Sequence, residues 1–371
     1  MLKASLGTGI LAMPNAFHNA GFTVGTIGTL VIGFLCTYAI HSLIGAGYEL
    51  CRRRKVPSMT YPQTSEAAFE EGPQWLRWFT PYAAFTTQLF LILYQIGASC
   101  IYVVFMASNI KAVRLRRNYA ETDVRLYMVY ILIPLILICW IRNLKLLAPF
   151  SSAANFITIV SFGITFYYIF SDIPHISQRQ AVGKVENMPL FFGTVLFAME
   201  AIGVILPLEN EMGNPKRFAS PFGVLNTSMI PITLLYTFKA EGSITLNLPK
   251  DEVLAQSVKL MLAASIYMCY ALSCYVAFDL ITSIVLVTFI LAVAIPNLEL
   301  FISLIGALCL ATMGIAFPAI IQMLTFWDYY RGFSFVLFLT KNTILILIAL
   351  LGFFIGTSTS LNKIYHEFFL S

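Results

Sequence analysis

Residues 4–48 read ASLGTGILAMPNAFHNAGFTVGTIGTLVIGFLCTYAIHSLIGAGY and contain no Asp, Glu, Lys or Arg. Two further stretches without these charged residues lie at 79–110 and 300–327. An α-helix needs about 20 mostly apolar residues to cross the ~30 Å hydrocarbon core of a bilayer. Apolar runs of this length recur along the chain, so the sequence predicts an all-α membrane protein that crosses a lipid bilayer many times.

The composition excludes most other classes of protein. Apolar residues make up 58% of the chain and charged residues 11%, with a mean hydropathy of +0.80, whereas soluble domains carry about 25% charged residues. The net charge of +5 is spread over short polar intervals and forms no basic face for nucleic acid. No CxxC pair, HExxH, GxSxG or P-loop pattern occurs, so we expect no metal site, no cofactor and no enzymatic activity.

Eleven apolar segments are predicted to be transmembrane spans within a single domain over residues 1–371. With the N-terminus in the cytoplasm, the inner intervals hold twelve Lys and Arg and the outer intervals eleven. The positive-inside rule therefore does not decide the orientation. The predicted spans lie near residues 4–22, 24–48, 79–109, 126–142, 149–171, 189–208, 220–238, 258–277, 280–297, 299–326 and 333–357.

Two of these segments are interrupted in the same way. The first carries Gly7 and Gly9 before Pro14, and the sixth carries Gly203 before Pro207. Gly and Pro weaken a helix through backbone freedom and a missing N–H group. Broken helices at corresponding places in two halves are typical of secondary transporters built from inverted repeats. The alternative is that Gly and Pro are simply common in membrane helices.

The interruptions predict a 5+5 inverted-repeat fold of the LeuT type, with helices 1 and 6 broken. The first repeat would cover about 1–171, the second about 189–326, and an extra helix about 333–357.

The stretch Gly7-Thr8-Gly9-Ile10-Leu11-Ala12 matches the G-x-G-x-x-A pattern of dinucleotide-binding folds. No strand precedes it and no α/β alternation follows, so we reject that interpretation. An unwound stretch here would instead leave backbone N–H groups unpaired and point the positive end of a half-helix at a carboxylate. The opposite half-helix end would suit an ammonium group, so a zwitterionic amino acid fits. A helix kink packed against a neighbour is the structural alternative.

Four other residues are candidates for function. Glu200 is the only acidic residue deep inside an apolar span; a charge there costs about 2.5–3.5 kcal/mol on insertion scales and usually marks a proton, ion or substrate path. The alternative is a neutral Glu bonded to a neighbouring helix. His41 in the second span is a proton-coupling candidate, as is His18 near the end of the first, since histidine titrates near neutral pH. A lone membrane histidine more often makes an interhelical hydrogen bond. Tyr102 in the third span is a candidate to face a central cavity.

The first helix resembles that of proton-coupled amino acid transporters of the amino acid/auxin permease superfamily. The resemblance is carried by KASLGTGILAMP at 3–14 and by Asn19-Ala20-Gly21. The sixth span, FAMEAIGVILPLENEM at 197–212, is similar too, as are GSITLNLP at 242–249, AIPNLEL at 294–300 and GFFIGT at 352–357. The match covers nearly the whole chain in the same order, and the loops look like those of insect members.

The resemblance implies an eleven-helix inverted-repeat fold with a cytoplasmic N-terminus. It implies symport of small neutral amino acids with protons, at the plasma membrane or a lysosomal or vacuolar membrane. Substrate contacts carry over to Gly7, Thr8, Gly9 and Ile10 on the first helix, and to Phe197 and Glu200 on the sixth. The implied partners are small neutral amino acids, protons and the lipid bilayer. An amino-acid-sensing membrane protein with little flux is the alternative function.

The chain also departs from the family pattern. Family members usually have Gly where Ala201 stands, and they carry an N-terminal tail ahead of the segment that begins here at Met1. Between Lys259 and Glu299 the only charge is Asp279, and no Gly, Pro or Asn marks a turn at 273–279, where the family has a loop. The family also extends the seventh helix where Phe238 runs into Lys239. We therefore predict a truncation, two internal deletions and, as a further alternative, a shortened, non-transporting isoform.

Overall fold

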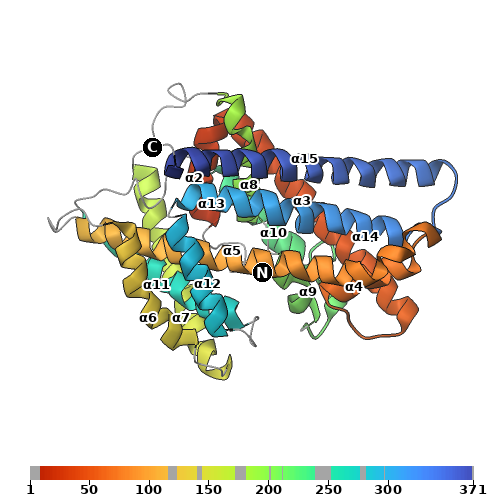
Figure 1. The fold of residues 1–371 in the computed structure, drawn as a ribbon, viewed down its shortest axis with the longest axis horizontal. Helices are drawn as coiled ribbons and strands as arrows, with labels where there is room; N and C mark the ends of the chain where they lie inside the picture. Colours follow the sequence, from red (N-terminus) through yellow and green to blue (C-terminus); the bar gives the residue numbers. More distant parts are fainter. Residues whose placement is uncertain are drawn as a thin grey trace.

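The computed structural model describes residues 9–115, 123–139, 144–171, 181–199, 202–210, 212–238, 252–275, 281–295 and 297–369. Within these ranges the chain is helical, with short connecting turns and no β-strand (Figure 1). The all-α class that the sequence predicts is therefore confirmed over the described residues.

Each of the eleven predicted spans contains helix among its described residues. In the sixth span these residues form α8 and α9, on either side of residues 200 and 201, and the tenth span is one continuous run made of α13, the π-helix η6 and α14. In chain order the helices of the spans are α2 (Gly9–Ala20), α3 (Phe22–Arg54), α5 (Thr80–Leu115), α6 (Val124–Cys139), α7 (Leu144–Ser171), α8 (Met188–Met199), α9 (Ile202–Asn210), α10 (Val224–Phe238), α11 (Val253–Tyr275), α12 (Ile281–Ala294), α13 (Leu298–Ile305), η6 (Gly306–Ala316), α14 (Phe317–Thr325) and α15 (Phe333–Phe369).

Five helical runs among the described residues are long and apolar enough to cross a membrane. Other apolar helices have fewer described residues: α12, for example, has 14 and directly follows residues 276–280, which lie outside the described ranges. The chain is therefore an integral membrane protein, whereas eleven complete crossings remain a prediction. The five runs are Phe22–Arg54, Gln74–Arg114, Val253–Tyr270, Leu298–Thr325 and Phe333–Glu367.

The interval 49–78, expected to be a polar loop, contains two helices. These are α4 (Tyr61–Glu71) and the 3-10 helix η1 (Gln74–Phe79). A capping box begins α4: the backbone N–H of Thr60 donates to the Gln63 side chain at 2.9 Å, and the Thr60 side chain accepts in return. The buried face of α4 packs against α5 and α14. The Thr-x-x-Gln signature was the sequence signal for this helix.

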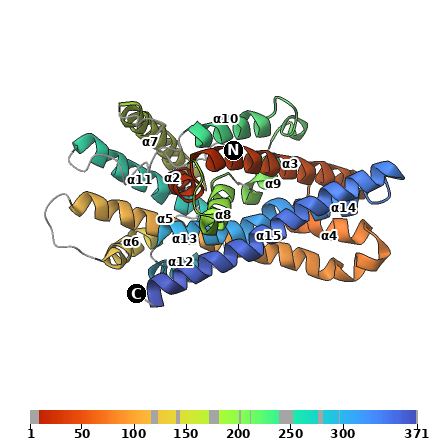
Figure 2. The same cartoon turned by 90° about the horizontal axis from the view of Figure 1, so that it is seen from above.

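The helices of the spans divide into two packed groups. In the first group, α2 packs against α3 and α8, and α3 packs against α8 and α10. In the second group, α5, α6, α11 and α12 all pack against one another, and α7 packs along α11. Figure 2 shows α6, α7 and α11 gathered on the left, with α3 and α10 extending to the right.

The tenth span connects the two groups. The run Leu298–Thr325 packs against α5, α8 and α15, and α14 also packs against α3. Its middle section, η6, is a π-helix of 11 residues; π-helical turns are rare and often lie at functional sites. α15 lies antiparallel beside this run (Figure 1) and exposes apolar side chains such as Leu337, Leu351 and Phe354. Lipid would cover these side chains in a bilayer.

Candidate transport site

The first and sixth spans meet where their backbones nearly touch. Gly9 at the start of α2 faces Ala198 near the end of α8, and a Cβ added to Gly9 would lie 2.4 Å from the Ala198 Cα atom. No side chain fits into that distance, so Gly9 is required for the approach of the two helices. Phe197 and Met199, on either side of Ala198, are buried. The structure thus brings together Gly9 and Phe197, two of the predicted substrate-binding positions.

The remaining predicted substrate positions on these helices are only partly described. Gly7, Thr8 and Glu200 lie outside the described residues, as does Ala201. The backbone of Ile10 belongs to α2, and its side chain is not among the described ones. Of the predicted interruptions, Gly9 and Pro14 lie within α2, and Gly203 and Pro207 lie within α9, so the chain is helical at these positions. Unwinding at Gly7, Thr8 and residues 200–201 lies outside the described residues and stays a prediction.

Tyr102 and His41 lie on other helices. Tyr102 is partly buried on α5, in the group of helices that does not contain α2 and α8. His41 on α3 makes a hydrogen bond to Asn226 on α10, with 2.8 Å between its Nε2 atom and the Asn226 Oδ1 atom. The Asn226 side chain in turn donates to the carbonyl oxygens of Ser220 and Pro221. His41 therefore ties the second span to the seventh.

A polar cavity of about 560 Å³, which we call the vestibule, lies at the end of the molecule where α2 ends and α13 begins. From α2 it is lined by Asn15, His18 and Asn19, and from α13 by Glu299. The Asn15 Nδ2 atom donates to the Glu299 Oε2 atom at 2.5 Å, which joins the first span to the tenth. Asn297 caps α13, because its side chain accepts hydrogen bonds from the backbone N–H groups of Glu299 and Leu300.

The C-terminal end of α15 forms another wall of the vestibule. Lys363, His366 and Glu367 line it. The Asn297 Nδ2 atom lies 2.8 and 2.9 Å from the two carboxylate oxygens of Glu367. The Lys363 ammonium group donates to the Asn187 Oδ1 atom at 2.5 Å, which links α15 to the segment before α8. The sequence predicted this helix only to residue 357, so its contribution to the vestibule was missed.

The vestibule leads toward the crossing of α2 and α8. Leu190 and Thr194 of α8 line it, and Ala198 follows Thr194 by about one helical turn, or ~6 Å along the axis. On α2, Asn15 lies six residues after Gly9, about 9 Å along the axis. A solute in the vestibule would therefore be one to two helical turns from the place where Gly9 meets Ala198.

A buried acid that the sequence analysis missed lies on α9. Glu209 is 4% exposed, and the Tyr48 hydroxyl on α3 lies 2.7 Å from its Oε1 atom and 2.8 Å from the carbonyl oxygen of Pro215. A cavity of about 80 Å³ adjoins this pair, which is room for two or three waters at ~30 Å³ each. Glu209 directly follows the predicted sixth span, and that position was the available signal.

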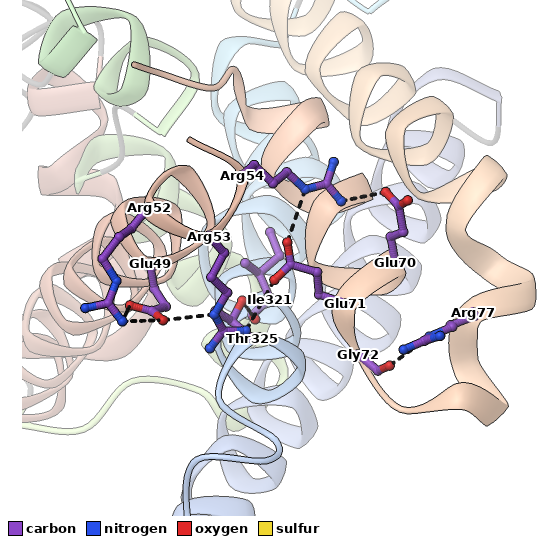
Figure 3. A network of polar contacts seen from close by, with 10 residues as sticks. All are labelled: Glu49, Arg52, Arg53, Arg54, Glu70, Glu71, Gly72, Arg77, Ile321 and Thr325. Carbon is purple, nitrogen blue, oxygen red and sulfur yellow. Dashed lines mark hydrogen bonds and ion pairs between the residues drawn. The ribbon is translucent and has the colours of Figure 1, made fainter. Parts of the chain in front are cut away.

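An arginine–glutamate network holds α4 against the end of α3 (Figure 3). Arg53 pairs with Glu49 at 2.9 Å and with Glu71 at 3.3 Å, while Arg54 pairs with Glu71 at 3.2 Å and with Glu70 at 2.5 Å. Partly exposed ion pairs of this kind contribute about 0.2–1 kcal/mol each. Of the described residues, none form a group of three His, Cys, Asp or Glu side chains that could hold a metal ion.

Long apolar helices together with a cavity lined by acidic and basic side chains are features of membrane transport proteins, in which such side chains mark substrate and ion paths. A sequence profile described as "transmembrane amino acid transporter protein" matches residues 1–283 and 280–362. The chain belongs to this transmembrane amino acid transporter family, which confirms the resemblance seen in its sequence.

Two relatives illustrate the similarity. The chain is 36% identical over 396 aligned positions to the proton-coupled amino acid transporter-like protein pathetic of Drosophila melanogaster, covering 98% of this chain and 83% of that protein. It is 23% identical over 415 positions to the probable amino acid transporter skat-1 of Caenorhabditis elegans, covering 99% of this chain and 89% of that protein. Both relatives are named as transporters, in agreement with the expectation that this chain is not an enzyme.

The alignment with the Drosophila protein is longer than the chain itself. It spans 396 positions, whereas the chain has 371 residues. At least 25 aligned positions, which is 396 less 371, are therefore gaps in this chain. The two predicted internal deletions are at the junction of Phe238 with Lys239 and at 273–279, and residues 239–251 and 276–280 lie outside the described residues.

Proposed function

We propose that this protein is a secondary active transporter of small neutral amino acids, which it carries in symport with protons. The proposed substrate-binding residues are Gly7, Thr8, Gly9 and Ile10 on the first span, Phe197 and Glu200 on the sixth, and Tyr102 on the third. Glu200 is the proposed proton carrier, with His41 as a second candidate.

The observation that carries the proposal is the contact of Gly9 with Ala198 one to two turns from the vestibule. The two spans that carry the Gly and Pro interruptions are the two that meet there. Unpaired backbone groups at such interruptions suit the carboxylate and ammonium groups of an amino acid. The small size proposed for the substrate follows from the family resemblance.

We also propose the 5+5 inverted-repeat fold, because the helices divide into two packed groups. The first group holds the first and second spans (α2, α3) together with the sixth and seventh (α8, α10). The second group holds the third and fourth spans (α5, α6) together with the eighth and ninth (α11, α12). Corresponding members of the two predicted repeats thus fall in the same group, which is what two structural repeats would produce.

The proposed orientation places the N-terminus in the cytoplasm. The vestibule then opens to the outside of a cell or to the lumen of a lysosome or vacuole. The basic cluster Arg52–Lys55 lies on the cytoplasmic side, as the positive-inside rule favours for short loops.

The test is uptake of a panel of radiolabelled amino acids into proteoliposomes, with and without an inward proton gradient. Accumulation of alanine, glycine or serine that rises at least severalfold with the gradient is expected. Saturable alanine binding without any flux would support the sensor instead. Uptake that does not change with the proton gradient would contradict proton symport but would not contradict amino acid transport.

A shortened form with weak transport is the second candidate, and the gaps in the alignment with the Drosophila relative favour it. Insertion of the family's additional segments after Phe238 and within 273–279 is expected to raise alanine uptake at matched surface expression. Equal uptake by the 371-residue chain and the extended form would contradict this second candidate.

A further inference from the structure

We propose that the vestibule is a separate entry site, where an amino acid is first bound through its charged groups before it reaches the crossing of α2 and α8. Glu299 would bind the ammonium group and Lys363 the carboxylate. The inference rests on the proposed transport function and adds a second site to it.

The size of the vestibule suits this role. Its volume of about 560 Å³ falls within the range of about 300–1,000 Å³ that is common for small-molecule sites. A small amino acid fits together with several waters, since each water occupies ~30 Å³. The site would therefore hold a partly hydrated amino acid, as expected of a first encounter.

The charged side chains that line the vestibule are Glu299, Lys363 and Glu367, and each has a neutral amide partner. The Glu299 carboxylate accepts a hydrogen bond from the Asn15 amide, and the Lys363 ammonium group donates to the Asn187 amide oxygen. The five arginine–glutamate ion pairs around Arg52–Arg54 involve neither Glu299 nor Lys363. A carboxylate has about four acceptor sites and an ammonium group has three donors, so Glu299 and Lys363 can each bind a ligand of opposite charge in addition to the present amide partner.

The two charges also come from different helices. Glu299 lies in the first turn of α13, and Lys363 lies near the end of α15. A molecule with both charges can pair with Glu299 on α13 and with Lys363 on α15, whereas a simple anion can pair only with Lys363 and a simple cation leaves Lys363 without a partner of opposite charge. This arrangement favours a zwitterion. Thr194, which also lines the vestibule, lies one helical turn before Ala198 on α8.

The experiment measures the concentration dependence of alanine uptake into proteoliposomes for the wild type, Glu299→Gln and Lys363→Gln. Each Gln side chain keeps an amide that can hydrogen-bond to the present partner. KM is expected to rise about tenfold in each variant, equivalent to about 1.4 kcal/mol, with the maximal rate within about twofold of wild type. The matched controls are Asp328→Asn and Arg331→Gln, which neutralise exposed charges between α14 and α15. Both should keep the wild-type KM.

Competition identifies which group each residue binds. Alaninamide, which lacks the carboxylate, should inhibit the wild type and Lys363→Gln equally and inhibit Glu299→Gln more weakly. N-acetylalanine, which lacks the ammonium group, should show the opposite pattern. Lys363→Arg keeps the charge and should retain the wild-type KM, which tests the site even if Lys363→Gln does not fold.

The outcomes separate the two proposals. Wild-type alanine uptake with an unchanged KM in both Gln variants would overturn the entry site and leave the transport function intact. A tenfold rise in KM for Lys363→Arg or for the two controls would also overturn it. Absence of amino acid uptake by the wild type would overturn the proposed function, and the entry site with it.

Discussion

Gly193 of α8 and Gly306 of η6 meet backbone to backbone. A Cβ on Gly306 would lie 1.8 Å from the Gly193 carbonyl oxygen, and a Cβ on Gly193 would lie 2.3 Å from the Ser303 carbonyl oxygen. Small residues allow membrane helices to approach closely and to pack through van der Waals contact. The sixth and tenth spans therefore cross where no side chain fits, directly beside Thr194 in the vestibule wall.

This crossing predicts that Gly306→Ala destabilises the protein. The added methyl group meets a backbone atom and not a movable side chain, so the helices must separate, at a cost of at least about 1–3 kcal/mol. A lower Tm is expected in detergent, measured by size-exclusion chromatography after heating. Gly163→Ala is the control, because its Cβ has nothing within 4 Å and Ala favours a helix by up to ~1 kcal/mol. Equal Tm values for the two variants would contradict the prediction.

Gly9→Val is expected to abolish alanine binding and uptake. The valine Cβ would lie 2.4 Å from the Ala198 Cα atom, so α2 and α8 must separate where the substrate is proposed to bind. The same clash lowers stability, so binding is measured on the monodisperse fraction by scintillation proximity. Gly45→Ala, in the open part of α3, should bind normally. A monodisperse Gly9→Val protein with wild-type alanine affinity would show that Gly9 serves only in packing.

Two substitutions separate the candidates for proton coupling. Glu200→Gln removes the carboxyl group from the sixth span and should flatten the increase in alanine uptake between pH 7.5 and pH 5.5. His41→Gln removes the titratable ring but keeps an amide able to bond to Asn226, so it should retain the wild-type pH profile. The measurement is the initial rate of alanine uptake into proteoliposomes at each pH. The reverse pattern would assign the coupling to His41 and make Glu200 structural.

The proposed orientation is tested by cysteine labelling. Lys55→Cys and His366→Cys place thiols at exposed positions at opposite ends of the molecule, in a background in which Cys51 is replaced by Ser. A membrane-impermeant maleimide should label His366→Cys on intact cells if the protein is at the plasma membrane. If it is in lysosomes, the reagent should label His366→Cys on intact lysosomes only after permeabilisation. Lys55→Cys should show the opposite accessibility. Labelling of both thiols from the same side would rule out an odd number of crossings between them.

Local properties of the sequence were enough to predict the class of the protein and most of its helices. The length of an apolar run and its lack of charge are enough to predict a membrane helix, because the bilayer imposes a fixed thickness. Those properties placed helix at all eleven predicted spans, and the ordered motifs from Gly7 to Thr357 indicated the family. The same properties missed α4, since a short helix with one buried face lacks a long apolar run, and they ended α15 too early.

The tertiary structure alone decided which distant residues share a site. No sequence motif connects Asn15, Glu299 and Lys363. They line one cavity only because α2 and α15 end on the side of the molecule where α13 begins. The approach of Gly9 to Ala198 likewise depends on how two helices cross. A sequence pattern records which face of a helix is apolar, whereas the partner of that face and the depth of contact follow from packing among all the helices.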